Sequence, residues 1–265
     1  MCTVSYLPLP TEGFVLTSTR DEKNIRKSAL PPAQYHIHDE KIIFPKDPDA
    51  GGTWIAASEG GYSLCLLNGG FKIHESKPPY RLSRGIVLLD FFKYMDVRDF
   101  LAGYDFQGIE PFTLLIAGGS DHSLNEPGRS TDEPGKNLDK PPRGLDELRW
   151  DGGHIHHTEL APENPRIWSS VTLYPDKVIR LREKWFQEWL LKDTEVSIAE
   201  AVSFHKKAGT GDMQNDIMMN RDEVRTVSIT SIVRSRNTYE MSYEDIISGK
   251  TFQRNISGER SFQST

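Results

Sequence analysis

The spacing of apolar residues predicts short β-strands that pair through tight turns at the start of the chain. Residues 2–9 and 13–22 are rich in strand-forming residues, and Glu12–Gly13 lies between them as a hairpin turn, where glycine adopts a positive φ at low cost. Residues 51–58 and 61–70 form a second pair of the same kind. Two neighbouring hairpins indicate an antiparallel sheet.

Helical periodicity begins after the second hairpin. Apolar residues recur at helical spacing within residues 83–104, interrupted near the middle, and again within 175–193. The acidic and basic residues of 175–193 are expected on a solvated face. Ser197 is the predicted N-cap of a further helix at 197–208. The remaining strand-like segments are 111–119, 145–160 (a hairpin), 224–234 and 237–244.

This order of elements defines the expected fold class. Strands grouped in pairs, with helices between the groups, predict an α+β fold with antiparallel sheets and argue against a parallel βαβ chain. A length of 265 residues suits one large domain or two small ones, and we interpret residues 1–265 as a single domain. Within it, a polar segment rich in proline and glycine at about 120–143 is an expected flexible insertion, and a polar tail starts at about 256.

Composition narrows the range of partners. A formal net charge of -6 provides no reason to expect nucleic acid as a partner. No apolar run approaches the ~18 residues of a membrane span, and no basic start followed by an apolar stretch marks a secretory signal. With only Cys2 and Cys65, no disulfide framework is indicated. We therefore expect a cytoplasmic protein; the sequence does not indicate its oligomeric state.

Cys2 is the first candidate for chemistry. Removal of Met1, which a small second residue favours, would leave a cysteine that carries both a thiol and a free α-amine. The amine titrates at ~7.7–8.0 and the thiol at ~8.5, so the amine can take the thiol proton near neutral pH. Position alone favours an ordinary buried strand cysteine, and residues elsewhere in the chain must decide between the two.

Candidate partners for Cys2 lie at the ends of the next strands. Asp21 lies at the end of the predicted strand that pairs with residues 2–9, so it can orient the α-amine. Arg20 can pair with Asp21 or bind a substrate carboxylate. Asn68 ends another apolar strand, and its amide can donate to an oxyanion. Each has a simpler interpretation as a surface ion pair or a turn residue.

The ordered set resembles a known family. Cys2, Thr-Arg-Asp-Glu at 19–22, Gly-Gly-Thr-Trp at 51–54, Asn68 and Ser-Arg-Gly at 83–85 resemble the NRDE family, which includes the transport and Golgi organisation protein 2 homologues. That family is similar to the N-terminal-nucleophile hydrolases of the choloylglycine and penicillin V acylase type. The resemblance implies a four-layer αββα sandwich of antiparallel sheets and amide-bond chemistry on acyl substrates.

The resemblance also assigns roles to residues. Cys2 corresponds to the nucleophile, Asp21 to the aspartate that contacts the α-amine, and Asn68 to the first oxyanion-side asparagine. Arg20 belongs to the NRDE-like tetrapeptide, and Arg225 resembles an arginine at the start of a late strand. The chain departs from the pattern at three places: Thr19 replaces the family's asparagine, Ser18 stands where the acylases have arginine, and Ser169 or Ser170 stands near their second asparagine.

Three hypotheses follow for the function. The first is an N-terminal cysteine hydrolase that cleaves a non-peptide C–N amide bond of a small acyl amide, without a cofactor. The second is a non-catalytic carrier or chaperone for a lipid, an acyl-CoA or haem. The third is a metal site at His154, His156 and His157, although their spacing matches no known zinc signature. A second Asn-Arg-Asp-Glu at 220–223 precedes a strand and has no equivalent of Cys2 nearby, so we interpret it as coincidental.

Overall fold

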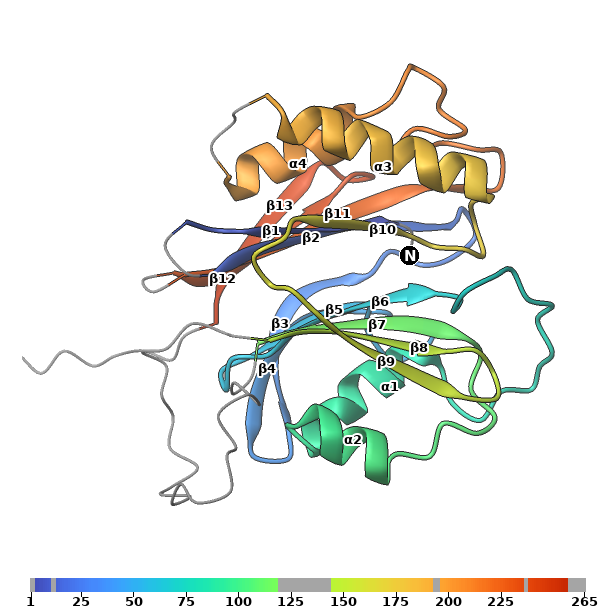
Figure 1. Cartoon of the computed structure of the whole chain (residues 1–265), viewed down its shortest axis with the longest axis vertical. Coiled ribbons are helices and arrows are strands. Elements are labelled where there is room, and N and C mark those ends of the chain that lie inside the picture. The colour runs from blue at the N-terminus through green and yellow to red at the C-terminus, as the bar shows by residue number, and fades with distance from the viewer. Residues whose placement is uncertain (1–2, 11–12, 119–143, 193–195, 236–237, 257–265) are drawn as a thin grey trace, which may run out of the picture.

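Two antiparallel β-sheets lie face to face, and a helical layer covers the outer face of each sheet (Figure 1). The computed structural model describes residues 3–10, 13–118, 144–192, 196–235 and 238–256. The layers follow the order α, β, β, α. This confirms the predicted α+β class and the four-layer sandwich that the resemblance implies.

The first sheet carries the start of the chain at its centre. It has six strands in the order β10-β1-β2-β11-β12-β13. β2 lies between β1 and β11, and its residues from Phe14 to Asp21 are all buried, because one face meets the second sheet and the other meets helices. The strands are β1 (Thr3–Pro8), β2 (Phe14–Lys23), β10 (Arg166–Ser169), β11 (Val224–Arg234), β12 (Tyr239–Asp245) and β13 (Lys250–Asn255).

The second sheet has seven strands that follow one another in sequence order. Its β5–β6 pair is the second predicted hairpin, so the two hairpins near the chain start lie in different sheets rather than in one. The strands are β3 (Leu30–Ile37), β4 (Glu40–Lys46), β5 (Ile55–Ser58), β6 (Ser63–Asn68), β7 (Phe112–Ala117), β8 (Leu145–Trp150) and β9 (Ile155–Leu160).

The helices lie in two layers, one on the outer face of each sheet (Figure 1). Ser197 caps the N-terminus of α4 as predicted, since its Oγ accepts a hydrogen bond from the backbone N–H of Glu200 at 3.2 Å. α1 (Arg84–Asp90) and α2 (Val97–Gly103) cover the seven-stranded sheet, with a 3₁₀ turn (Phe91–Lys93) between them, and α3 (Asp176–Leu190) and α4 (Ile198–Lys207) cover the six-stranded sheet.

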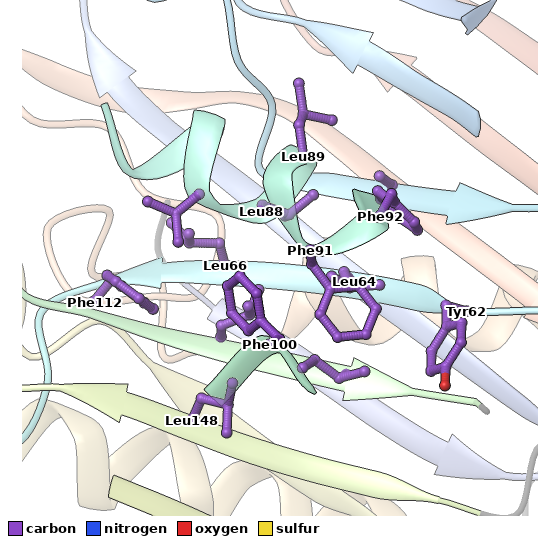
Figure 2. Packing of buried hydrophobic residues seen from close by; sticks show 14 of the residues in the cluster. Tyr62, Leu64, Leu66, Leu88, Leu89, Phe91, Phe92, Phe100, Phe112 and Leu148 are labelled. Atoms are coloured by element: carbon purple, nitrogen blue, oxygen red, sulfur yellow. The ribbon is translucent and has the colours of Figure 1, made fainter. Parts of the chain in front are cut away.

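Aromatic and aliphatic side chains fill the space between the seven-stranded sheet and its helices (Figure 2). Phe91 and Phe100 meet edge to face, with ring centroids 5.5 Å apart, and Leu64 and Leu66 of β6 are both buried. A second core, which includes Val4 of β1 and Trp54, lies between the two sheets. β6 is therefore packed on both faces, and this fixes the position of the residue that ends it.

Four strands, β3, β4, β10 and β13, were not predicted from the pattern. Pro31 and Pro32 interrupt the strand-like composition of β3, β10 has only four residues, and β13 is a polar edge strand without apolar alternation. The predicted insertion at about 120–143 and nearly all of the tail from about 256 lie outside the described residues. Among the helices that the structure describes, none is long and apolar enough to cross a membrane.

His205 is expected to make folding stability depend on pH. It is fully buried in α4, where its Nε2 lies 2.8 Å from Ser5 Oγ, and burial together with the charge of Arg182 lowers its pKa from 6.5 to about 3. The unfolded chain takes up a proton at this residue below about 6.5 and the folded chain does not, so stability falls as the pH drops from 6.5 toward 3. Urea unfolding at several pH values should show that the free energy of unfolding of the His205→Gln variant falls less steeply with decreasing pH than that of the wild type. Equal slopes for the two proteins would contradict this.

Candidate active site

The first described residue lies inside the six-stranded sheet. Thr3 of β1 is opposite Thr19 of β2 on one side and Ser169 of β10 on the other. The Thr3 side chain is fully buried, and its Oγ1 accepts a hydrogen bond from Arg182 Nη1 at 2.6 Å. Cys2 lies outside the described residues, so the surroundings of Thr3 define this end of the chain.

Asp21 is a buried carboxylate with a donor on each oxygen. Its exposed fraction is 3%. Tyr174, in the segment before α3, donates its hydroxyl to Oδ2 at 2.6 Å, and Thr226 of β11 donates to Oδ1 at 2.5 Å. Two charge-assisted hydrogen bonds from different elements hold the carboxylate in one orientation. Neither Tyr174 nor Thr226 was identified from the sequence.

Arg20 faces the other side of β2, as the alternation of side chains along a strand requires. Its guanidinium lies 2.9 Å from Asp47 Oδ2 and 3.3 Å from Glu22 Oε2, and 4.7 Å from the ring centroid of Trp54. Burial raises the pKa of Asp47, but the Ala50 backbone N–H and the guanidinium of Arg20 outweigh it and hold that pKa below its ordinary value. Arg20 therefore pairs with Asp47 and Glu22 on a face that looks away from Asp21.

A cleft of about 120 Å³ opens beside Arg20. It contains five charged side chains and only two large apolar ones, so it is a polar cleft. Trp54, 2% exposed, lines it, and the buried Nε1 of its indole has no hydrogen-bond partner within the described part of the chain. The lining residues are Arg20, Glu22, Arg26, Asp47, Ala50, Gly52, Thr53, Trp54, Leu66, Asn68, Ser83, Arg84 and Gly85.

The other two predicted site residues lie at strand ends, as expected. Asn68 is the last residue of β6 and lines the cleft, and its carbonyl oxygen accepts a hydrogen bond from Ser170 Oγ at 2.9 Å. Arg225, the second residue of β11, is paired in register with Glu22 of β2, and its Nε is buried without a partner among the described residues. Arg20 and Asn68 thus share the cleft, whereas Asp21 lies on the helical side of β2.

Two of the three histidines in the 154–157 segment lie at hydrogen-bond distance from carboxylates. His156 Nε2 lies 2.8 Å from Asp151 Oδ2, and His157 Nε2 lies 2.7 Å from Asp146 Oδ1. No group of three or more histidine, cysteine, aspartate and glutamate side chains that could hold a metal ion is found in the part of the chain that the structure describes. The hydrogen bonds account for His156 and His157 without a metal.

Replacing Trp54 by phenylalanine is expected to cost less stability than the same change at Trp150. Both residues are 2% exposed, but Trp150 Nε1 donates to the carbonyl oxygen of Ile109 at 2.8 Å, whereas Trp54 Nε1 has no acceptor among the described residues. Trp150→Phe leaves a buried acceptor unpaired, and Trp54→Phe removes a buried unpaired donor. We expect the two free energies of unfolding to differ by about 1–3 kcal/mol in urea titrations; equal costs would contradict an unpaired indole in the cleft.

Solved structures of two hydrolases share this fold. Penicillin V acylase from Agrobacterium tumefaciens is similar in structure, with 12% sequence identity over 97% of this chain and 86% of that chain and a TM-score of 0.51. Two variants of conjugated bile acid hydrolase from Clostridium perfringens give 9% identity each, with TM-scores of 0.54 (96% and 92% of the chains) and 0.50 (100% of both). At these identities the likeness establishes the fold, that of the N-terminal-nucleophile hydrolases.

A sequence match then gives the family. The model of the family described as Transport and Golgi organisation 2 matches residues 1–141, more than half of the chain. The protein belongs to this family, as the ordered motifs around Cys2, Asp21 and Asn68 indicated. No curated protein matches the chain significantly.

Proposed function

We propose that the protein is an N-terminal cysteine hydrolase that cleaves a non-peptide C–N amide bond of an acyl substrate after Met1 has been removed. The observation that carries the proposal is Asp21, a buried carboxylate close to the start of β1 with both oxygens fixed by hydrogen bonds. The shared fold supports it, and conjugated bile acid hydrolase has been solved with alanine in place of the cysteine at its second position. We further propose that residues 1–265 form one domain.

The reaction uses the two groups of a processed Cys2. The α-amine takes the thiol proton, and the thiolate attacks the acyl carbonyl carbon to form a tetrahedral oxyanion. The protonated amine gives its proton to the leaving nitrogen as the C–N bond breaks, which leaves a thioester and releases the free amine product. Water, which loses a proton to the α-amine, then hydrolyses the thioester to the carboxylic acid and restores the thiol.

The other site residues take supporting roles in this proposal. Asp21 orients the α-amine, and the side-chain amide of Asn68 donates to the oxyanion. Thr3 is paired with Thr19, so Arg20 is the next residue of β2 on the side of the chain start. The side chain of Arg20 lines the cleft beside this end of β1. Arg225 supplies a nearby positive charge for a substrate carboxylate.

The cleft favours a short, polar acyl substrate. A volume of about 120 Å³ and five charged lining residues give little room or apolar surface for a long acyl chain. The same features give no support to the alternative function, a carrier of lipid, acyl-CoA or haem, because such ligands need a larger apolar cavity. A small-molecule acyl amide is therefore the proposed ligand class.

A panel of N-acyl amides tests this proposal. Short polar and long aliphatic acyl groups should be compared with the wild type, a Cys2→Ala variant and a Cys65→Ala variant, with the released amine as the readout. We expect hydrolysis of short acyl amides by the wild type and Cys65→Ala, and none by Cys2→Ala. Equal activity in the wild type and Cys2→Ala would refute the proposal, and a lipid or haem that copurifies with an inactive protein would favour the carrier.

A further inference from the structure

Two arginines converge on the tyrosine that holds Asp21. The guanidinium carbon of Arg182 in α3 lies 3.6 Å from the ring centroid of Tyr174, and that of Arg221 lies 5.2 Å from the same centroid. The hydroxyl of this ring donates to Asp21 Oδ2 at 2.6 Å. A carboxylate, a phenol and two cations are thus linked in one chain of contacts next to β1.

Arg182 is bound in an unusual way for a buried charge. Its exposed fraction is 0%, and no carboxylate within the described residues lies at ion-pair distance from it. Its donors instead contact Thr3 Oγ1 at 2.6 Å and the carbonyl oxygens of Asn215 (3.1 and 3.2 Å) and Asp216 (2.5 Å). Burying an arginine without a salt bridge is costly, which points to a role beyond packing.

We propose that Arg182 and Arg221 are positioning residues that act on Asp21 through Tyr174. This rests on the proposed function, in which Asp21 orients the α-amine of Cys2. The two cations draw electron density from the phenol ring, so its O–H is a stronger donor, and stacking fixes the direction in which it donates. Because Arg182 also binds Thr3, one side chain holds both the start of β1 and the ring that sets the carboxylate.

Arg221 gives a function to the second Asn-Arg-Asp-Glu tetrapeptide. This segment, interpreted from sequence as coincidental, lies just before β11, and Arg221 donates to the carbonyl oxygens of Gln214 (2.9 Å) and Leu173 (3.3 Å). The second contact ties Arg221 to the residue next to Tyr174. The segment thereby supplies a cation beside the Tyr174 ring, although nothing in the tetrapeptide alone indicates this.

Few other charged groups lie near Tyr174 and Asp21. Thr226 of β11 donates to the second oxygen of Asp21. Arg225, on the same strand, lies opposite Glu22 of β2. From α4, His205 lies near Arg182, and its pKa of about 3 keeps it uncharged at neutral pH. Arg20 and Glu22 pair with one another on the opposite face of β2. The two arginines beside Tyr174 are therefore the cations expected to act on its hydroxyl.

The pH profile of Cys2 alkylation tests the proposal. The chain should be released from a fusion by a protease that leaves Cys2 first, so that the test does not depend on natural removal of Met1. The rate of iodoacetamide addition to Cys2 is then measured by mass spectrometry from pH 5 to 9. Tyr174→Phe, which keeps the ring, should lower the rate at pH 7 by about tenfold and shift the profile to higher pH, because a misplaced Asp21 no longer holds the ammonium beside the thiolate.

Arg221→Gln, at a partly exposed position, should cause a smaller shift in the same direction. Tyr104→Phe is the matched control, because Tyr104 donates to Asp90 at 2.9 Å on the other helical layer. Arg149→Gln is the second control, with its guanidinium 5.2 Å from the Phe71 ring. Neither control should change the profile.

The outcomes separate this proposal from the proposed function. If folded Tyr174→Phe and Arg221→Gln keep the wild-type profile, the positioning role is refuted while Cys2 can still be the nucleophile. If wild-type Cys2 reacts no faster than a free cysteine in a peptide, both proposals fail. A protein made from Met1 that retains this residue refutes the proposed function in the cell, whereas a shifted profile in the released chain would still support positioning.

Discussion

Replacing Asp21 by asparagine is expected to lower the rate of amide hydrolysis by about 10²- to 10⁴-fold, the usual contribution of general acid–base catalysis. The asparagine side chain fits the same space and can still exchange hydrogen bonds with Tyr174 and Thr226, which both carry rotatable hydroxyl groups. What is lost is the negative charge that stabilises the α-ammonium form of Cys2. Steady-state kinetics on the best substrate of the acyl amide panel would measure this.

Asp90→Asn provides the matched control for this prediction. Asp90 also accepts a hydrogen bond from a tyrosine, Tyr104, and is 9% exposed, but it lies at the end of α1 on the other side of the molecule. We expect its hydrolysis rate to stay within about twofold of the wild type, since the hydrogen bond of Asp90 with Tyr104 and its ion pair with Lys93 involve no residue that lines the cleft or binds Asp21. Equal rates in Asp21→Asn and the wild type would remove Asp21 from the mechanism.

Replacing Arg182 by methionine is expected to destabilise the fold by about 1–3 kcal/mol, the cost of leaving buried hydrogen-bond acceptors without a donor. The change leaves Thr3 Oγ1 and the carbonyl oxygens of Asn215 and Asp216 without the donors that bind them. Burial of the charge itself costs free energy, so its removal offsets part of this loss. Urea unfolding followed by circular dichroism should show a lower midpoint.

Arg180→Met is the matched control, because Arg180 lies two residues earlier in α3 and is exposed. Arg180→Met is expected to change the free energy of unfolding by no more than about 0.5 kcal/mol, as for most surface substitutions. An Arg182→Met variant as stable as Arg180→Met would show that the buried contacts contribute little. The stability of Arg182→Lys should lie between those of Arg182→Met and Arg180→Met, because an ammonium keeps the charge but cannot reproduce the planar stack on Tyr174.

The same helix shows where sequence patterns stop being informative. The spacing in α3 correctly predicted an amphipathic helix, but it placed all charged residues on a solvated face, whereas Arg182 is fully buried beneath the helix. Periodicity assigns a position to a face from residue type, and only the distant acceptors of Asn215 and Thr3 stabilise a guanidinium there. Contacts between residues so far apart in sequence leave no local signal.

The sequence predicted only those residues of the candidate site that lie near strand ends. Asp21 lies near the end of β2 and Asn68 ends β6, so their placement toward the ends of these strands followed from the pattern and from the family resemblance. Tyr174 and Thr226 follow no recognisable motif, because each reaches Asp21 through the packing of its own element against β2. The pairing of Arg20 with Asp47 likewise depends on how the two sheets face each other.

The most direct test of the account is the mass of the intact protein expressed from Met1, combined with mapping of the first alkylated cysteine. We predict a chain that lacks Met1 and in which iodoacetamide labels Cys2 well before Cys65, since burial raises the pKa of the Cys65 thiol to about 12. A protein that keeps Met1, or that is labelled at Cys65 as fast as at Cys2, would contradict an N-terminal cysteine nucleophile.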